Sequence, residues 1–467
     1  MVRHIYIYFE VIIMEKKRSS FTGKIGFVLA AAGSAVGLGN IWRFPYLAAK
    51  YGGGTFLLIY IILSVTFGFA LMVAEIGLGR KTQLSPIGAF EKLNKKFSFV
   101  GYLAALIPML ILPYYSVIGG WVTKYLFAFV SGGDKSAANS NYFGNFISST
   151  GEPLLWFAIF MGATAIIVLF GVEKGVEKVS KVMMPVLIFL SIGIAIYTMF
   201  IPGAMKGVLH YITPDFSSMT AEKLILTIVA AMGQLFYSMS LAMGIMITYG
   251  SYMKKEVSIE SSVHQIEIFD TGIAFLAGLM IIPAVSVFSP EKLGTQAGPG
   301  LMFETLPAIF ADMPGGGIIG TVFFLLVLFA ALTSSISLME TVVSIFQDKF
   351  KWNRKLSCLA VLIVCILLGL PSSLGYGPWA TVKLLGMQFL DFFDFISNSV
   401  LMPIAALFTC IFVGFIIKPK AIIDEVELSG KFKLKSLFTV MIRYVAPICL
   451  VLILASSVLS ALGIITI

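Results

Sequence analysis

Residues 33–46 read GSAVGLGNIWRFPY, and this stretch decides how the rest of the sequence is interpreted. It lies within an apolar run at about 24–49, which exceeds the roughly 20 residues that a helix needs to cross a bilayer. Gly33, Gly37 and Gly39 fall near the middle of this run, and each glycine costs a helix interior about 1 kcal/mol. Polar side chains flank them. The stretch therefore predicts a membrane helix that is interrupted at mid-depth.

A second apolar run, at about 222–252, is interrupted in the same way at residues 233–244, which read GQLFYSMSLAMG. Close packing of helices through small residues would explain either stretch alone. However, the two interruptions lie at corresponding places, in the first spans of two successive sets of five. Discontinuous helices paired between two inverted halves indicate a transporter with its site at the breaks.

The unwound backbone has a chemical consequence. Its carbonyl oxygens have no helical partner, and lipid cannot satisfy them, so they must line a polar cavity or bind something. Carbonyl and hydroxyl oxygens suit a hard cation such as sodium. The N-termini of half-helices carry partial positive charge and suit a carboxylate. One site can therefore hold cations together with an anionic group of a substrate.

The composition agrees with an all-α polytopic membrane protein. The chain is 58% hydrophobic and 12% charged with a mean hydropathy of +0.96, whereas a soluble domain carries about twice that charge. The net charge of +9 is spread between the apolar runs, so it does not indicate a nucleic-acid partner. We expect about eleven transmembrane helices, at about 24–49, 54–79, 98–130, 154–171, 178–201, 222–252, 262–288, 315–347, 356–371, 380–416 and 437–465.

Basic residues are concentrated in the loops after the second, eighth and tenth runs, which predicts a cytoplasmic N-terminus, an outside C-terminus and a location in the cell membrane. The expected parts are a cytoplasmic segment 1–23, a first five-helix repeat 24–201, a second, inverted repeat 222–416 and an additional helix 437–467. Residues 1–13 precede Met14, which is expected to be the natural start, so these thirteen residues are expected not to be native. The outside loop at about 289–314 is expected to hold a short helix. The cysteines are expected to be buried thiols: Cys358, Cys365, Cys410 and Cys449.

Residues 33–46 resemble the neurotransmitter:sodium symporter family. The resemblance continues through residues 52–54, 75–80, 114–115, 247–252 and 332–335, and covers the chain from about residue 18 to the end. It implies two sodium ions, a small amino acid substrate and no obligate protein partner beside membrane lipid. The first sodium site would use Ala35, Asn40, Ser238 and Asp270. The second would use Gly33, Val36, Ala330, Thr333 and Ser334, although back-bonding within a helix is the ordinary role of such hydroxyls.

The resemblance also implies a substrate site and two gates. Tyr115 would donate to the substrate carboxylate, Tyr237 would be an aromatic lid, and Ser240 would offer backbone groups to the amine. The remaining substrate contacts would be Leu38, Gly39, Ile111, Ile118, Met243 and Leu338. Arg43 and Asp394 would form the outer gate, and the inner gate would consist of Arg18, Tyr252 and Asp348. Glu75 would hydrogen-bond the broken helices, and Ala242 departs from the glycine that is common in relatives.

Three positions bear on the substrate and on chloride. Gly37 stands where relatives that carry monoamines have an aspartate, which favours an amino acid, and the apolar lining suggests a hydrophobic one. Asp270 stands where animal relatives have an asparagine, while Ala274 stands where a bacterial relative has a glutamate. Asp270 would then be both ligand and counter-charge, so no chloride requirement is expected.

Other classes of function compete with symport. A channel would need a continuous polar stripe, whereas the polar groups here gather at the two breaks. A receptor on the same fold, or a symporter for another small zwitterion, stays open. An enzyme is not expected, because no metal-ligand spacing and no nucleophile–base set is present in the sequence.

Overall fold

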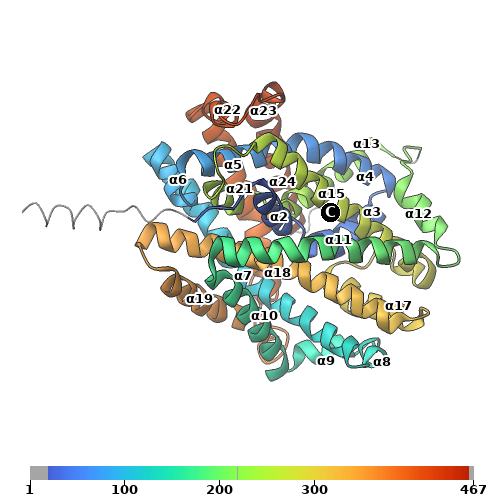
Figure 1. Cartoon of the computed structure of the whole chain (residues 1–467). Coiled ribbons are helices and arrows are strands. Elements are labelled where there is room, and N and C mark those ends of the chain that lie inside the picture. Colours follow the sequence, from blue (N-terminus) through green and yellow to red (C-terminus); the bar gives the residue numbers. More distant parts are fainter. Residues whose placement is uncertain (1–18, 218, 462–467) are drawn as a thin grey trace, which may run out of the picture.

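The protein is a bundle of long helices that run roughly side by side (Figure 1). The computed structural model describes residues 19–217 and 219–461, and within these ranges every regular element is a helix. Nine of the described helices are long and apolar enough to cross a membrane, and a bent pair at the start makes ten. The interrupted run near residue 240 brings the count to the expected eleven. The expected all-α membrane architecture is confirmed.

The membrane spans are built from the following elements. The first six are α2 (Lys24–Ala35), η1 (Gly39–Arg43) and α3 (Phe44–Lys50); α4 (Gly54–Leu63), η2 (Ser64–Gly68) and α5 (Phe69–Thr82); α7 (Ser98–Val130); α10 (Gly151–Leu169); η4 (Val172–Glu177) and α11 (Lys178–Met199); α13 (Ala221–Ser238) and α14 (Ile245–Ser251). The remainder are α15 (Ile259–Phe288); α18 (Gly316–Phe350); α19 (Arg354–Leu374); α20 (Phe389–Asp394), η7 (Phe395–Leu401), α21 (Met402–Ile411) and η8 (Phe412–Ile416); α23 (Lys435–Val440), η9 (Met441–Val445) and α24 (Ala446–Ala461).

Short helices occupy the loops at the two ends of the bundle. They are α6 (Pro86–Leu93), η3 (Lys95–Phe97), α8 (Asp134–Ala137), α9 (Tyr142–Ser148), α12 (Met205–Ile212), η5 (Pro290–Lys292), α16 (Gly298–Gly300), η6 (Leu301–Thr305), α17 (Leu306–Asp312) and α22 (Lys420–Glu427). In Figure 1, α8, α9, α12 and α17 lie toward one end, and α6 lies toward the opposite end. The helix expected in the loop at about 289–314 is present as α17.

The first interruption occurs where the sequence predicts it. Helix α2 ends at Ala35, the chain is extended at Val36, and the axis of the following helix is bent by 53° relative to α2. The second interruption is narrower than expected, because α13 continues through Gly233 to Ser238 and only residues 239–244 are unwound. Three residues of this stretch have left-handed backbone: Ser240 (φ 53°), Ala242 (φ 60°) and Gly244 (φ 74°). These conformations, which side chains disfavour, end the helix there.

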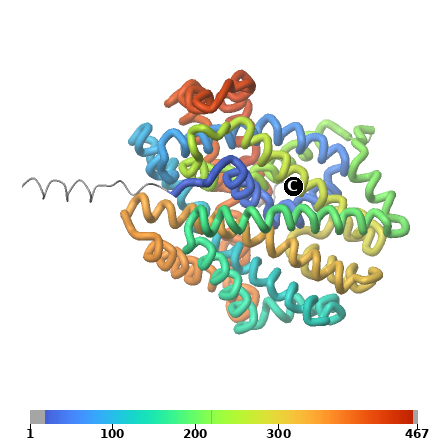
Figure 2. The backbone as a smooth tube through the Cα atoms, in the orientation of Figure 1, coloured from blue at the N-terminus to red at the C-terminus, as the bar shows by residue number. Residues whose placement is uncertain are grey.

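The core of the bundle surrounds both breaks. Helix α18 packs along α7, and α2 packs against α11, α15 and α18, so the interrupted helices lie between long, continuous ones (Figure 2). The outward faces of the peripheral helices expose large apolar side chains such as Phe189 (79% exposed), as a lipid-facing surface requires. The tenth span begins at Phe389 rather than at the expected residue 380, because residues 375–388 form turns. Cys358, Cys365 and Cys410 are buried, Cys449 is partly buried, and none of the four forms a disulfide.

Candidate functional site

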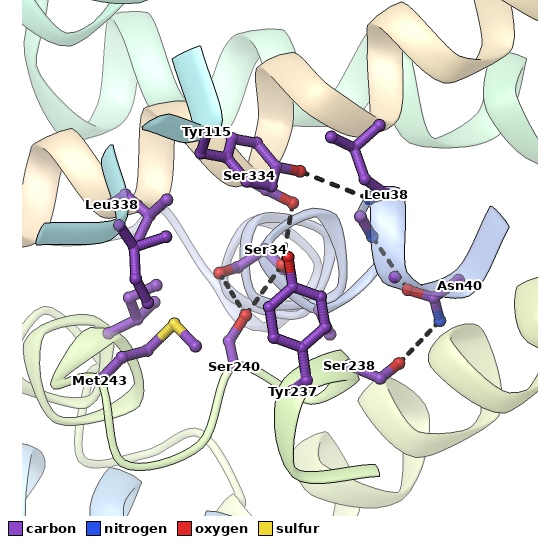
Figure 3. A pocket seen from close by; sticks show the side chains of 15 residues that line it. Ser34, Leu38, Asn40, Tyr115, Tyr237, Ser238, Ser240, Met243, Ser334 and Leu338 are labelled. Carbon is purple, nitrogen blue, oxygen red and sulfur yellow. Dashed lines mark hydrogen bonds between the residues drawn. The ribbon is translucent and has the colours of Figure 1, made fainter. Parts of the chain in front are cut away.

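A pocket lies between the two breaks. Its cavity volume is about 30 Å³, so the surrounding side chains nearly fill it in this structure. Its lining comes from the first break, the sixth span, α7 and α18. Figure 3 shows its two ends, with Leu338 and Met243 gathered on one side and Leu38, Asn40 and Ser238 on the other. The lining residues are Ser34, Ala35, Gly37, Leu38, Gly39, Asn40, Ile111, Tyr115, Tyr237, Ser238, Ser240, Met243, Ile245, Ser334 and Leu338.

Three of the residues expected at the first sodium site meet directly. Asp270, which is fully buried, accepts hydrogen bonds at Oδ1 from Ser238 Oγ (2.6 Å) and Asn40 Nδ2 (2.8 Å). Its Oδ2 accepts one from the Tyr60 hydroxyl (2.9 Å). All these donors are neutral. A buried carboxylate without a countercharge is costly, so a cation beside Asp270 would stabilise it.

The amide of Asn40 is turned away from the orientation that a cation ligand needs. Its Oδ1 accepts from the Gly37 amide (3.0 Å), while its NH₂ group points to Ser238 and Asp270. An amide of this kind can rotate by 180° to exchange oxygen for nitrogen, because the two ends have similar size. The rotation would bring a third oxygen toward Asp270.

At the expected second sodium site, two hydroxyls of α18 play different roles. Ser334 Oγ donates to Ser34 O (3.1 Å) and to Val36 O (3.4 Å), so it connects α18 to the first break. Thr333 Oγ1 instead donates within its own helix, to Phe329 O (3.0 Å) and Ala330 O (3.1 Å). That is the ordinary back-bond of a helical threonine. Gly33 nevertheless lies against it, since a Cβ built on Gly33 would be 3.2 Å from Thr333 Cβ.

The polar end of the pocket contains Tyr115. The Leu38 amide donates to the Tyr115 hydroxyl (3.4 Å), which places the hydroxyl at the N-terminus of the outer half-helix. Gly37 leaves this space open, because a Cβ there would lie 2.8 Å from Ser334 Oγ and 3.2 Å from the Tyr115 hydroxyl. An acidic side chain at position 37 would fill the same volume. The combination of a hydroxyl, a free backbone terminus and no fixed acid suits a carboxylate group.

The apolar side chains expected to contact the substrate lie at the pocket, with one exception. Ile111, Met243 and Leu338 line the pocket, and Ile245 joins them. Ile118 is buried but does not line the pocket. Tyr237 lies over the first break, since a Cβ at Gly39 would be 2.6 Å from its ring.

The two outer-gate residues do not pair directly within the part of the chain that the structure describes. The Arg43 guanidinium lies 5.8 Å from the centre of the Tyr237 ring. Asp394 Oδ1 accepts from the Tyr114 hydroxyl (3.0 Å) and from Asn398 Nδ2 (2.6 Å). The residues of the expected outer gate thus lie around the lid, and their pairing stays a prediction.

Of the inner-gate residues, Tyr252 and Asp348 are described and Arg18 lies outside the described residues. The Tyr252 hydroxyl donates to Glu340 Oε1 (2.9 Å), and Glu340 forms an ion pair with Arg354. Asp348 Oδ2 accepts from the Ser85 amide (2.7 Å). Asp348 therefore joins α18 to the loop before α6.

Glu75 makes the contact expected of it. Its Oε1 accepts from the Ala242 amide (2.6 Å), which supports the left-handed residue in the middle of the second break. An unwound segment leaves such amides without helical partners, so a carboxyl group from α5 satisfies one of them.

Four contributors to the site are not among the residues expected from the sequence: Ser34, Tyr60, Gln234 and Ile245. Ser34 bridges the two breaks, because its carbonyl accepts from both Ser240 Oγ (2.9 Å) and Ser334 Oγ. Gln234 Nε2 donates to Gly39 O (3.0 Å), the carbonyl of the first residue of η1. Polar residues inside apolar runs were the available signal for Ser34, Tyr60 and Gln234. Ile245 is an apolar residue in an apolar run, so the sequence carries no signal that it lines the pocket.

A transporter that moves hard cations together with a small solute needs buried oxygen atoms, and the two paired helix breaks provide them. This fold therefore places the protein in the class of secondary transporters. The chain belongs to the Sodium:neurotransmitter symporter family, which its sequence matches over residues 18–133 and 137–464. It is therefore a multi-pass membrane protein that acts as a sodium-dependent transporter and not as an enzyme.

Its relatives include a bacterial and a human protein. The uncharacterized sodium-dependent transporter YhdH of Bacillus subtilis is 36% identical over 94% of this chain and 97% of that protein. The human sodium- and chloride-dependent GABA transporter 2 is 26% identical over 89% of this chain and 77% of that protein. Among solved structures, MhsT in complex with L-phenylalanine superposes with a TM-score of 0.85 at 37% identity, covering 94% of this chain and all of MhsT.

Proposed function

We propose that this protein is a symporter that uses two sodium ions to import a hydrophobic amino acid across the cell membrane by alternating access. The observation that carries the proposal is the pocket between the breaks, which is polar at the Tyr115 end and apolar at the Met243 and Leu338 end. An amino acid has the same division, with charged groups at one end and a side chain at the other. The L-phenylalanine bound to MhsT, a structure of the same fold, supports this class of substrate.

Two clusters of buried oxygens support the two-ion stoichiometry, one around Asp270 and one where Ser334 meets the carbonyls of Ser34 and Val36. Asp270 would supply a full negative charge beside these ions, while an amino acid substrate carries both a carboxylate and an ammonium group and has no net charge. Arg43 lies farther out, beside the lid. In a low-dielectric site the opposite charges stabilise each other, whereas an unpaired charge is strongly penalised.

Asp270 is also the reason why no chloride requirement is expected. Asp270 is a fixed negative charge beside the proposed first ion, and its carboxylate is held by three neutral donors. A free anion would therefore duplicate a charge that the chain already carries. The human relative whose name includes chloride dependence shares the family but is only 26% identical.

The proposed orientation has a cytoplasmic N-terminus. It rests on the basic loops after the second, eighth and tenth spans, which would face the cytoplasm. The bundle supports it, since α6 of the second-to-third loop lies toward the opposite end from α12 and α17.

The decisive test is uptake by purified protein in liposomes. Two sodium ions that move through ~100 mV, each with a tenfold gradient, supply roughly 7 kcal/mol, which permits about a 10⁵-fold accumulation. We expect concentrative uptake of hydrophobic amino acids in sodium and none above leak in choline. Equal uptake in both salts would contradict symport, and unitary conductance in planar bilayers would favour a channel.

A further inference from the structure

Glu177 is a buried carboxylate outside the proposed site, and its partners lie on the segment that leads into α2. The Thr22 amide donates to Glu177 Oε2 (2.9 Å), and the Thr22 hydroxyl donates to Oε1. Lys181, one turn further along α11, lies with Nζ 2.6 Å from the same Oε1. The Glu177 side chain is 1% exposed, whereas that of Lys181 is 41% exposed. The contact therefore joins the start of the first span to the fifth.

Helix α2 is shaped to receive this carboxylate. Gly26, in the first turn of α2, faces Glu177 so closely that a Cβ at position 26 would overlap the carboxyl group. Two independent features thus match one side chain, namely the donors of Thr22, just before α2, and the missing side chain of Gly26, within α2.

Phe21, the residue before Thr22, is held by apolar contacts. Phe21 is 1% exposed and packs edge-on against Phe27 and Tyr249, at ring distances of 5.6 and 5.5 Å. Its amide donates to Tyr252 O (3.1 Å), at the end of α14. Residues 21 and 22 are therefore held by the inner half of the sixth span on one side and by η4 on the other.

The other end of α2 carries the proposed second sodium site. Gly33 lies between Thr333 of α18 and Met184 of α11, because a Cβ at position 33 would be 3.2 Å from Thr333 Cβ and 3.4 Å from Met184 Sδ. Sodium at that site would tie the end of α2 to α18. The Glu177 contact ties its beginning to η4. One short helix thus has two tethers, and α11 and η4 form one continuous span beside both.

We propose that Glu177 is a positioning residue for transport, a latch that holds α2 against η4 while the cytoplasmic side is closed and that must open before α2 can move. The latch and sodium at the second site then favour the same closed state. By linkage, loss of the latch lowers the apparent affinity for sodium, although Glu177 does not touch the ion. The inference rests on sodium binding at the second site, which is part of the proposed function.

The test compares Glu177→Gln with Glu173→Gln, an exposed glutamate in the same π-helical turn. Hydrogen exchange of peptides that span residues 19–35 reports opening of the start of α2. We expect Glu177→Gln to speed this exchange by at least about fivefold in potassium buffer, with partial recovery in sodium. The sodium concentration for half-maximal thermal stabilisation should rise by about the same factor. Glu173→Gln should match the wild type in both measurements.

Three further variants keep the proposal testable if Glu177→Gln does not fold. Gly26→Ala displaces the carboxylate from the opposite side, and Thr22→Val removes the hydroxyl donor, whereas Thr22→Ser retains it. We expect the first two to behave like Glu177→Gln and the third to behave like the wild type. Unchanged exchange and unchanged sodium dependence in Gly26→Ala and Thr22→Val would overturn the proposal.

These measurements separate the latch from the proposed transport activity. None of them requires an amino acid substrate. If wild-type protein shows no sodium-dependent stabilisation, the second site fails. If stabilisation is normal and exchange at residues 19–35 does not respond to the variants, the latch alone fails.

Discussion

Asp270 is held by an amide and two hydroxyls, all of them neutral donors. Such a shell stabilises the charged form of a carboxylate without neutralising it, which suits a group whose countercharge arrives with a ligand. The residue thus serves two proposed roles at once, as a ligand of the first sodium and as the fixed anion of the site.

This double role predicts the response to chloride. Wild-type uptake should be unchanged when gluconate replaces chloride, because Asp270 already supplies the negative charge. Asp270→Asn should either acquire a chloride requirement or stop transport. Asp391→Asn, which changes an exposed acid of α20, is the matched control and should behave like the wild type. A collapse of wild-type uptake in gluconate would remove Asp270 from the role of substitute anion.

Tyr115 allows a second prediction for a single residue. Tyr115→Phe should weaken amino acid binding by about 1–3 kcal/mol, because a buried carboxylate would lose one donor. Equilibrium binding of a radiolabelled amino acid measures this change. Tyr125→Phe removes a hydroxyl that donates to Phe303 O (2.7 Å) away from the pocket, so it should leave affinity unaltered. An unaltered affinity in Tyr115→Phe would show that this hydroxyl does not face the substrate.

The second break shows how a single element is kept unwound. Ser240, Ala242 and Gly244 all have positive φ, and only the last of them is a glycine. Left-handed backbone costs an ordinary residue roughly 1–2 kcal/mol, so this segment stores strain. The Ala242 amide is held by Glu75, which offsets part of that cost.

This strain predicts an unusual response to glycine. Ala242→Gly should leave the protein unchanged or stabilise it by up to about 1 kcal/mol, because relief of the left-handed strain outweighs the added freedom of the unfolded chain. Ala231→Gly, in the regular part of α13, should instead destabilise by about 1 kcal/mol or more. Thermal unfolding of the two purified variants decides the matter. Equal destabilisation would mean that the backbone of Ala242 is not strained.

At the scale of the whole molecule, ions bound at the breaks should hold together segments that are far apart in sequence. The proposed second site would tie α2 to α18, two elements about 300 residues apart along the chain. A ligand that binds only the folded state stabilises it by about 2.7 kcal/mol per site at a hundred times its dissociation constant.

Sodium should therefore raise the thermal midpoint of the purified protein relative to choline. Thr333→Ala combined with Ser334→Ala should lose about half of that increase and should abolish transport, because two hydroxyl oxygens around the second ion disappear. Identical midpoints of the wild type in sodium and choline would argue against bound ions. A normal sodium response of the double variant would exclude the second site alone.

The sequence by itself determined the membrane class, the approximate spans and the position of the first break. Apolar runs, loop charges and clustered glycines are local signals, because each segment interacts with the bilayer according to its own sequence. The family resemblance carried by residues 33–46 and by the later motifs also pointed to most of the pocket lining. Residues 233–238 were expected to be unwound but are helical, since glycine and hydroxyl residues tolerate a helix when its neighbours favour one.

Only the tertiary structure decided which distant groups meet. Tyr60 reaches Asp270, and Glu177 receives Thr22 across 155 positions of sequence. It also decided that Thr333 back-bonds within its helix while Ser334 crosses to the first break. Such pairings depend on the rotation and depth of each packed helix. Those are set by the close packing of side chains from several elements at once, and no single stretch of sequence carries them.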